Sequence, residues 1–509
     1  MLERKIMTSK IHSIMPCGLN GKLVFVEGDI KKGLPTFSIV GMANKTINEA
    51  KERVKSAILN SGFSFPTRKI TINLAPADFL KDGSYLDLPI ALSILVLSRQ
   101  LLLSDTANKL FVGELSLSGE LRAVKGIINI VELARKEGFK EVYIPEENLA
   151  QAALVKGIKV YGARSLKDVF LALLNKNVLE STDDVKITKT EQKDDDLDIL
   201  DHIRGQNLAK RAVQIAVAGH HNLLISGPPG AGKTMLAKAA ANLLPELPPE
   251  EVLEVTKIYS MAGLSNSGVI TKRPFRNPHH TASAVSIVGG GANAMPGEIS
   301  LAHKGVLFLD ELPEYSRALL ETLRQPLEDK QIVISRAGGK NIYPADFMLI
   351  ATMNPCPCGY LGDKTHECKC TETQIQNYRR KLSGPLLDRI DMNITVERVE
   401  NAELARPITQ KTGEHIVVKN TITEAISRQK ARFKKNGMFN SSLSSWQVAT
   451  LLKLDVAAEE LLKTASTTLN LSARSYFKTI KVAQTIADLE GADIIKESHI
   501  AEALSFRKR

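Results

Sequence analysis

The sequence predicts an α/β protein of about three domains, in which a phosphate-binding module lies between an α+β domain and a helical region. Three observations predict this architecture. Mixed strand and helix periodicity fills the first 176 residues, strand–loop–helix alternation follows to about residue 400, and helical periodicity continues to the C-terminus. The length of 509 residues leaves room for a separate core in each part.

Composition and charge narrow the class of protein. Apolar residues make up 43% and charged residues 24% of the chain, which excludes a disordered, collagen-like or disulfide-scaffold protein. The N-terminus lacks the apolar segment of a secretory signal, and the longest apolar run, residues 88–103, is too interrupted to span a bilayer. Five cysteines suit a reducing compartment, so we expect a cytoplasmic protein without membrane contact. The 67 Lys and Arg against 56 Asp and Glu give a net charge of +11, which is compatible with a polyanionic partner but does not demonstrate one.

The first domain is expected over residues 1–176. Ile70, Ile72 and Leu74 alternate with polar residues, which predicts a strand with one buried face. Upstream, apolar residues recur at helical spacing before a stop at residues 60–62, which predicts a helix. These apolar residues are Ile47, Ala50, Val54, Ala57 and Ile58.

Two segments of this domain resemble the proteolytic domain of Lon-type proteases, an α+β fold of the ribosomal S5 type: residues 81–89 (KDGSYLDLP) and 113–119 (GELSLSG). The resemblance places Tyr85 at the position of the serine nucleophile and Ile128 at that of the activating lysine, so an active protease is not expected. A substitute dyad of Ser84 with Lys81 or Lys125 is the alternative. A Lon-like domain without its dyad is expected to be a scaffold for a ring or a DNA-binding platform.

Residues 177–200 are predicted to form a linker. The segment is polar, contains two acidic runs and has no apolar period. It separates the first domain from the phosphate-binding module, expected over residues 201–400, and from the helical region, expected over residues 401–509.

The strongest motif is a glycine-rich loop between a short apolar strand, residues 221–226, and a helix over residues 235–244. The loop GPPGAGKT matches G-x-x-x-x-G-K-[ST] at every fixed position. Glycines let backbone N–H groups converge on phosphate oxygens, Lys233 can reach the β- and γ-phosphates, and the Thr234 hydroxyl can ligate Mg²⁺. An accidental Gly/Pro-rich turn is the alternative. The loop residues expected to contact a nucleotide are Gly227, Pro228, Pro229, Gly230, Ala231, Gly232, Lys233 and Thr234.

A second buried strand, residues 305–309, ends in two carboxylates, Asp310 and Glu311. Asp310 would hold Mg²⁺, and Glu311 would orient and polarise the attacking water. An acidic strand end alone is common. After a glycine-rich loop it predicts a site that hydrolyses ATP with Mg²⁺ as cofactor.

Further features resemble the AAA+ family of ATPases, which implies a three-layer α/β module with a C-terminal helical lid. Ile203, Gly205 and Gln206 resemble the segment that packs on adenine. The strand over residues 347–354 ends in Asn354, at the sensor 1 position of that family.

Two arginines complete this resemblance. Arg389 stands where the family places a finger that reaches the ATP of a neighbouring subunit, and Arg474, at the start of a helix, matches the sensor 2 arginine of the lid. Such a finger is worth ~10³–10⁵ in rate, because it neutralises charge that develops in the transition state. A surface salt bridge is the alternative for each arginine. A finger acting in trans requires an oligomer, and the resemblance implies a hexameric ring.

Two inserted segments, residues 272–304 and 332–343, resemble the helix-2 insert and the pre-sensor 1 hairpin of the group that contains magnesium chelatase ATPase subunits and MCM helicases. In DNA-handling members such loops project into the pore, where cations contact phosphate and an aromatic ring stacks on a base. The alternative is that Phe275 packs in its own subunit and the basic residues are only solvated. The expected DNA contacts are Lys272, Arg273, Phe275, Arg276, Arg336 and Lys340.

Cysteine and histidine pairs raise two metal hypotheses. For His279 and His280, adjacent side chains diverge, so capping or packing is expected rather than metal binding. The cysteines suit either a tetrahedral structural Zn²⁺ or four reduced thiols on a surface loop, since C-x-C is tighter than the usual spacing. They are Cys356 with Cys358, and Cys368 with Cys370.

The domain order resembles the ComM/YifB family over essentially the whole chain, apart from a short extension before Thr8. The resemblance implies an ATP-driven hexameric motor on single-stranded or branched DNA, which promotes branch migration in homologous recombination and natural transformation alongside recombination proteins. The alternatives are a metal-chelatase motor, an AAA+ chaperone that remodels a protein partner, and a Lon-like ATP-dependent protease, which Tyr85 and Ile128 disfavour.

Overall fold

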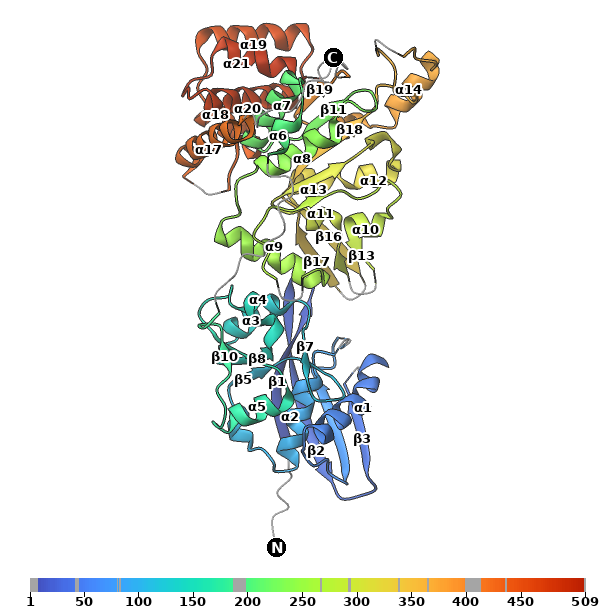
Figure 1. Cartoon of the computed structure of the whole chain (residues 1–509), viewed down its shortest axis with the longest axis vertical. Coiled ribbons are helices and arrows are strands. Elements are labelled where there is room, and N and C mark those ends of the chain that lie inside the picture. Colours follow the sequence, from blue (N-terminus) through green and yellow to red (C-terminus); the bar gives the residue numbers. More distant parts are fainter. Residues whose placement is uncertain are drawn as a thin grey trace.

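The computed structural model is elongated, with the N-terminal sheet at one end and a layer of C-terminal helices at the other (Figure 1). Among the helices of the described residues, none combines the length and apolarity that crossing a membrane requires. The structure describes residues 8–41, 45–79, 81, 84–185, 198–265, 268–291, 294–336, 339–363, 366–398, 413–434 and 437–507.

The N-terminal part is built on a mixed eight-stranded sheet. Its centre is a long antiparallel hairpin of β1 and β2, with β4 antiparallel to β2 and β5 parallel to β1. The predicted alternation in β4 is confirmed, because Ile70, Ile72 and Leu74 are fully buried. The sheet order is β10-β9-β8-β5-β1-β2-β4-β3, and a small hairpin of β6 and β7 lies beside it. The strands are β1 (Thr8–Cys17), β2 (Asn20–Lys31), β3 (Thr36–Val40), β4 (Lys69–Ala75), β5 (Lys109–Phe111), β6 (Glu114–Leu115), β7 (Leu121–Arg122), β8 (Glu141–Pro145), β9 (Lys159–Ala163) and β10 (Glu180–Ser181).

Helices of this part supply its core. The predicted helix before residue 60 is confirmed as α1. The long apolar run contains α2, all of whose residues are buried, which explains why it is apolar on every side. The helices are α1 (Lys45–Asn60), α2 (Asp87–Leu97), α3 (Ile127–Lys136), α4 (Leu149–Ala152) and α5 (Leu166–Leu173).

The predicted linker is shorter than residues 177–200. β10 lies inside that segment and pairs antiparallel with β9, so the first sheet continues to Ser181, and Val185 still packs against the core of this part. At the other end, α6 (Ile199–His202) already belongs to the next core. Residues 186–197 lie outside the described residues. A polar, acidic segment carries too little apolar pattern to reveal a two-residue edge strand.

The central module contains a five-stranded, wholly parallel sheet in the order β12-β15-β18-β11-β19. The predicted strands at residues 221–226, 305–309 and 347–354 are confirmed as β11, β15 and β18. Because β11 comes first in the chain but lies between β18 and β19, the strand order reverses beside it, where parallel sheets place their ligands. The strands are β11 (Leu223–Ser226), β12 (Phe275–Arg276), β15 (Val306–Leu309), β18 (Met348–Met353) and β19 (Met392–Thr395).

Two small hairpins accompany this sheet, β13 with β14 and β16 with β17. The second confirms the hairpin predicted before the sensor 1 strand. Their bounds are β13 (Gly289–Gly290), β14 (Met295–Pro296), β16 (Gln331–Arg336) and β17 (Gly339–Pro344). The helices of the module are α7 (Asn207–Gly219), α8 (Lys233–Leu243), α9 (Pro249–Ala262), α10 (Ala284–Val288), α11 (Glu298–Leu301), α12 (Arg317–Thr322), α13 (Arg324–Asp329), α14 (Glu372–Arg380) and α15 (Gly384–Leu387).

The C-terminal helices share one apolar core with α7, α8 and β11. α20 begins where Ser472 caps its first turn by accepting a hydrogen bond from the Ser475 N–H, and it buries Ile480, Ala483 and Ala487 as predicted. The helices are α17 (Glu414–Phe433), α18 (Ser445–Leu451), α19 (Val456–Thr468), α20 (Ala473–Leu489) and α21 (Glu497–Ser505).

The N-terminal part contacts the central module at several places. One is α4, where Gln151 Nε2 donates to the carbonyl oxygens of Ser265 (2.7 Å) and Gly268 (3.1 Å). The Gly126 N–H donates to the carbonyl oxygen of Ser260 (3.2 Å), which joins the start of α3 to α9. In addition, Leu19, at the turn between β1 and β2, packs into the core beneath the β16–β17 hairpin. A Cβ added to Gly18 at that turn would lie 2.8 Å from the Asn341 side chain, so the turn touches the hairpin directly.

Candidate functional site

Three strand ends bring the predicted site residues together at one edge of the parallel sheet. The glycine-rich loop follows β11, Asn354 follows β18, and Asp310 with Glu311 follows β15. β18 lies between the other two strands, so the sensor 1 position stands between the phosphate loop and the acidic pair.

The phosphate loop leaves its backbone open for an anion. Gly230 and Gly232 have φ angles of +79° and +82°, in the left-handed region that favours glycine, and a Cβ at either would meet open space. Gly232 caps α8, which begins at Lys233, so the N–H groups of its first turn have no intrahelical acceptor. Thr234 is exposed in that turn. Open N–H groups at a helix N-terminus fit phosphate oxygens.

Lys233 is held over this cradle. Its Nζ donates to Asn354 Oδ1 (2.8 Å) and to the carbonyl oxygens of Gly227 (2.5 Å) and Pro228 (3.1 Å). Burial lowers the pKa of Lys233, whereas the nearby carboxylates of Asp310 and Glu311 oppose that shift. The lysine and the acidic pair therefore lie within electrostatic range of one another.

Thr352, which was not among the predicted site residues, contacts the two acidic residues in different ways. Thr352 Oγ1 donates to Asp310 Oδ1 and accepts a hydrogen bond from the Glu311 N–H (3.0 Å). Asp310 is partly buried, whereas Glu311 is exposed and has a φ of +52°. The signal that could have identified Thr352 is its position as the polar residue in the otherwise apolar β18.

The histidine pair lies beside the acidic pair. Asn277, His279 and His280 line a cavity of about 200 Å³ together with Asp310 and Glu311. His279 Nδ1 lies 2.8 Å from Thr281 Oγ1 and accepts from the Thr281 N–H (3.3 Å). The two histidine side chains do not diverge as expected, because their ring centroids lie 4.1 Å apart. Sequence spacing did not reveal the proximity of the histidines to the acidic pair, because it depends on how the insert folds back onto β15.

The segment expected to pack on adenine lies near the end of β19. Ile203 is buried in the core, and Gln206 Nε2 donates to the carbonyl oxygen of Glu397 (2.5 Å). Beyond it, Arg398 donates to the carbonyl oxygen of Pro229 in the phosphate loop (3.3 Å). Gly205, which lies between Ile203 and Gln206 in the chain, has a φ of +58°.

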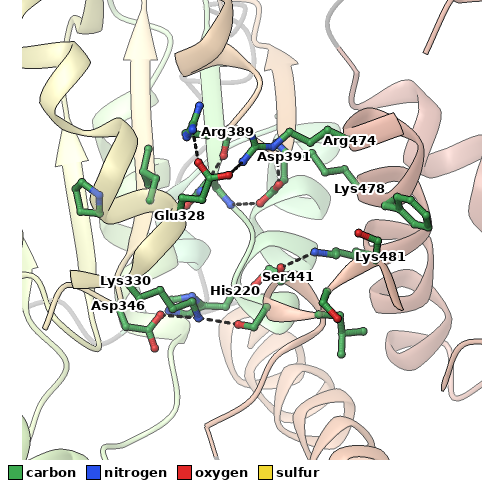
Figure 2. Close-up of a pocket in the computed structure, with 18 of the residues that line it drawn as sticks. His220, Glu328, Lys330, Asp346, Arg389, Asp391, Ser441, Arg474, Lys478 and Lys481 are labelled. Carbon is green, nitrogen blue, oxygen red and sulfur yellow. Dashed lines mark hydrogen bonds and ion pairs between the residues drawn. The ribbon is translucent and has the colours of Figure 1, made fainter. Parts of the chain in front are cut away.

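Arg389 and Arg474 meet at one carboxylate, that of Glu328 in α13 (Figure 2). Arg474 donates to Glu328 Oε1 (2.8 Å), and Arg389 also donates to the carbonyl oxygens of Arg324 (3.0 Å) and Pro385 (2.8 Å). Both arginines line a cavity of about 650 Å³, and the described residues around it include none from the phosphate loop. The two arginines are therefore grouped with each other rather than with the Lys233 of their own chain. Lys330, Lys478 and Lys481 add positive charge to the same cavity.

Three of the residues expected to contact DNA are instead engaged within the chain. Arg273 is buried against Glu251 (3.0 Å), and Arg276 donates twice to the carboxylate of Glu298 (2.6 and 2.7 Å). The Phe275 ring stacks on Phe308 with a centroid separation of 5.7 Å. These three are removed from the expected DNA-contacting set, because their side chains already have acceptors or packing in the core. Lys272 and Lys340 are exposed, and the side chain of Arg336 lies outside the described residues.

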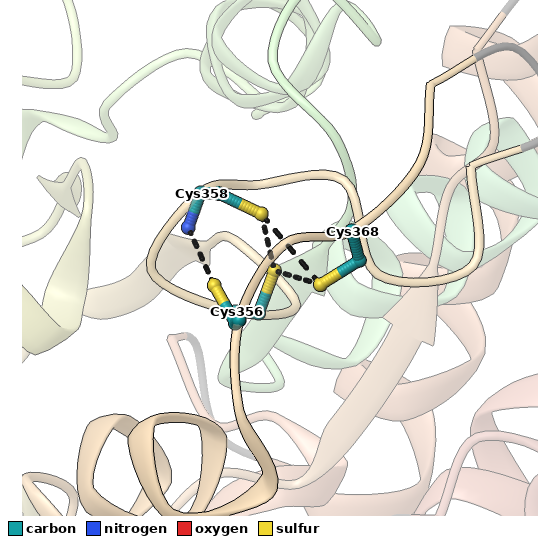
Figure 3. A group of neighbouring side chains, drawn as sticks. Cys356, Cys358 and Cys368 are labelled. Atoms are coloured by element: carbon teal, nitrogen blue, oxygen red, sulfur yellow. Dashed lines mark hydrogen bonds between the residues drawn. The ribbon is translucent and has the colours of Figure 1, made fainter.

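The four cysteines come together as a cluster whose sulfur atoms all lie within 4.8 Å of one another (Figure 3). They occupy the loop between β18 and α14, directly after Asn354. None forms a disulfide. Such a cluster could hold a metal ion.

The segments that resemble a Lon-type protease contain no serine–lysine pair among the described residues. Ser84 Oγ donates to Glu114, and the buried Lys81 Nζ donates to the carbonyl oxygen of Pro76. Ile128, which the Lon resemblance was expected to place at the lysine position, is fully buried. This geometry offers no support for the substitute dyad of Ser84 with Lys81.

Comparisons with known proteins identify relatives along the whole chain. Residues 199–404 match the family described as magnesium chelatase, subunit ChlI; residues 26–148 match subunit ChlI of Mg-chelatase; and residues 414–507 match the C-terminal region of that subunit. The chain is 42% identical over 502 residues to the competence protein ComM of Haemophilus influenzae, covering 98% of this chain and 97% of that protein. It is 42% identical over 508 residues to the protein YifB of Escherichia coli, with the same coverage. The magnesium-chelatase 67 kDa subunit of Chlorobaculum parvum is 29% identical over 157 residues, which cover 30% of this chain and 23% of that subunit.

Proposed function

Because the chain belongs to the ComM/YifB family of magnesium chelatase-like AAA+ proteins, we propose that it is an ATP-hydrolysing ring motor that acts on DNA. The observation that carries the proposal is the position of Lys233, which bonds Asn354 and lies within electrostatic range of Asp310 and Glu311. In the proposed domain organisation, residues 1–176 are a Lon-like scaffold, residues 201–400 the ATPase module and residues 401–509 a helical lid.

Each residue of the site has a separate task in this proposal. ATP, when bound with Mg²⁺, supplies the phosphoanhydride bond that is hydrolysed. Lys233 and the N–H groups of the phosphate loop balance the phosphate charge, and Thr234 with Asp310 would hold the metal. Glu311 orients the attacking water and accepts its proton, while Asn354 fixes the lysine.

A ring would complete the site at each subunit boundary. Arg389 and Arg474 share Glu328 in the single chain, and together they would present two positive charges to the ATP of a neighbouring subunit. Charge placed there counts most in the transition state, when negative charge on the transferred phosphoryl group is redistributed. In the single chain both arginines form the salt bridge that was the alternative, so the proposal requires them to leave Glu328 when subunits assemble. We infer a hexamer from the AAA+ resemblance.

DNA is the proposed substrate. A net charge of +11 favours a polyanion, and the exposed Lys340 at the β16–β17 hairpin suits a contact with phosphate. The name of the Haemophilus influenzae relative, a competence protein, supports a role in natural transformation. We therefore propose helicase or branch-migration activity on single-stranded or branched DNA during homologous recombination, in the cytoplasm and alongside recombination proteins. The proposed cofactors are ATP, Mg²⁺ and a structural Zn²⁺.

The test is whether DNA raises ATP turnover by the purified protein. We expect single-stranded or branched DNA to stimulate hydrolysis at low salt. The stimulation should fall steeply as salt rises, because lysine and arginine side chains that contact phosphate displace the counterions condensed on DNA. Lys340→Ala should weaken the stimulation and lower the salt slope by about 1. Lys463→Ala, on the exposed face of α19, is the matched control. Absence of stimulation at low salt contradicts the choice of DNA.

A second candidate is a chelatase-type or chaperone-type ATPase that remodels a protein partner. The match to the magnesium-chelatase 67 kDa subunit favours it. The same assay separates the two candidates, since this one predicts ATP turnover that rises with a protein substrate and is indifferent to DNA.

A further inference from the structure

The cysteine cluster has sulfur spacings that indicate a shared ion. Cys356 Sγ lies 3.3 Å from Cys358 Sγ and 3.6 Å from Cys368 Sγ, and Cys358 Sγ lies 3.6 Å from Cys368 Sγ (Figure 3). A tetrahedral ion with Zn–S bonds of about 2.3 Å holds its sulfurs about 3.8 Å apart, whereas a disulfide holds them at about 2.05 Å. The observed spacings fit the ion and exclude the disulfide.

Backbone N–H groups point at two of the four sulfur atoms. The Cys358 N–H donates to Cys370 Sγ (3.4 Å), and the Leu361 N–H donates to Cys356 Sγ (3.3 Å). Backbone N–H groups aimed at sulfur stabilise its negative charge and orient the ligand. Cys356 is fully buried, and the other three cysteines are partly buried.

The loop that carries the cluster, residues 356–370, packs on the phosphate loop. A Cβ added to Gly359 would lie 2.9 Å from Pro229 Cδ, so the two backbones are in contact. Arg398 ties both together, because its guanidinium lies 3.2 Å from His366 Nδ1 and donates to the carbonyl oxygen of Pro229 (3.3 Å). The His366 ring stacks on Tyr360 at 4.9 Å between centroids.

The same loop continues directly from the sensor 1 position. Asn354, which bonds Lys233 at 2.8 Å, stands two residues before Cys356. An ion at the cluster would therefore hold the residues that follow Asn354. It would also hold the part of the loop that contacts Pro229.

We propose that the four cysteines bind one structural Zn²⁺, and that this ion clamps residues 356–370 against the phosphate loop so that Lys233 and Asn354 are positioned for ATP. The inference rests on the proposed function, since the clamp acts on a nucleotide site. Among the described residues, the cluster offers four soft sulfur ligands, which selects Zn²⁺ over Mg²⁺ or Ca²⁺.

The test begins with metal analysis of the full-length protein purified without added metal. We expect about one Zn²⁺ per chain in the wild type and in Cys17→Ser, the fifth cysteine, and a loss of that ion in Cys368→Ser. Less than about 0.2 Zn²⁺ per chain in the wild type overturns the zinc site, whatever the ATPase activity.

The clamp is tested separately by equilibrium binding of a fluorescent ATP analogue with excess Mg²⁺. Removing Zn²⁺ from the wild type with a zinc-selective chelator should weaken binding at least about tenfold, and added Zn²⁺ should restore it, a change that corresponds to about 1.4 kcal/mol. This reversible arm remains informative if Cys368→Ser does not fold. Unchanged binding after Zn²⁺ removal overturns the clamp but leaves the zinc site standing. Failure of zinc-loaded wild type to bind nucleotide overturns the proposed ATPase instead.

Discussion

Charge is divided among three residues at the proposed nucleotide site. Lys233 provides the cation, Asp310 a carboxylate held by the Thr352 hydroxyl, and Glu311 an exposed carboxylate. The same hydroxyl accepts the Glu311 N–H, so Thr352 connects the backbone of one acid to the side chain of the other. Two adjacent carboxylates can therefore serve two tasks.

Glu311→Gln should separate nucleotide binding from hydrolysis. The phosphate and metal contacts of Lys233, Thr234 and Asp310 remain, so we expect ATP binding to persist and the ring to be stabilised. We expect kcat to fall by about 10²–10⁴-fold, the usual effect of losing a general base. Steady-state ATPase assays with a nucleotide-binding measurement check this, with Lys233→Ala as the variant that loses binding and Glu314→Gln as a nearby acidic control. Normal turnover by Glu311→Gln would show that the assignment is wrong.

Thr352→Val should impair metal use without removing either carboxylate. Valine has nearly the same shape but cannot donate to Asp310 or accept the Glu311 N–H, and a buried group left without a hydrogen bond costs about 1–3 kcal/mol. We expect a higher Mg²⁺ concentration for half-maximal ATPase activity and a lower thermal midpoint. Thr352→Ser keeps the hydroxyl and should behave like the wild type. Equal Mg²⁺ dependence for valine and serine would contradict a role for the hydroxyl.

At the scale of elements, the helices and strands that could be predicted are those with a strong local pattern of apolar residues. β4, β11, β15 and β18 were predicted because their apolar residues alternate or run together over several positions, and α20 because a capping serine precedes a helical period. β10 was missed because two residues in a polar segment produce no period. The phosphate loop was identified from the spacing of its fixed residues together with the predicted strand before it and the predicted helix after it.

The insert between α9 and β15 shows where local patterns stop being informative. Arg273 and Arg276 are basic and follow a turn, so their sequence suits a DNA-facing loop. Their ion-pair partners, Glu251 and Glu298, lie more than twenty positions away along the chain, and the packing of α9 and α11 brings them together. In the same way, the spacing of the cysteines in the sequence could not distinguish a zinc site from free thiols, because the difference depends on whether the folded loop brings the four sulfur atoms together.

Arg273→Ala should therefore act on stability before it acts on DNA. The side chains of Arg273 and Glu251 are only 7% and 10% exposed, and removing one member of a buried pair costs about 3–5 kcal/mol. The lower end of that range is expected, because Lys304 remains 3.7 Å from Glu251. Thermal unfolding checks this, with the exposed neighbour Lys272→Ala as the control. A thermal midpoint equal to that of the wild type would return Arg273 to the DNA-contacting set.

At the scale of the whole molecule, the N-terminal part touches two elements that flank the acidic strand. α3 contacts α9, which precedes β15 in the chain, and the β1–β2 turn contacts the β16–β17 hairpin, which follows it. A change in the nucleotide site that moves either element would therefore also change its contacts with the N-terminal part. This arrangement suits a scaffold that links the hairpin to the rest of a ring.

Mixing two inactive variants tests whether subunits of the proposed ring share their catalytic residues. Arg389→Ala keeps Glu311, and Glu311→Gln keeps Arg389, so a boundary that joins the ATP site of the first to the arginine of the second is fully equipped. In a cyclic assembly with random mixing at equal amounts, about a quarter of the boundaries have this composition. We expect ATPase activity to reappear on mixing in the assembled state and to disappear on dilution below assembly. If Arg389 acts on the ATP of its own chain, no boundary is complete, and the mixture stays as inactive as its parts.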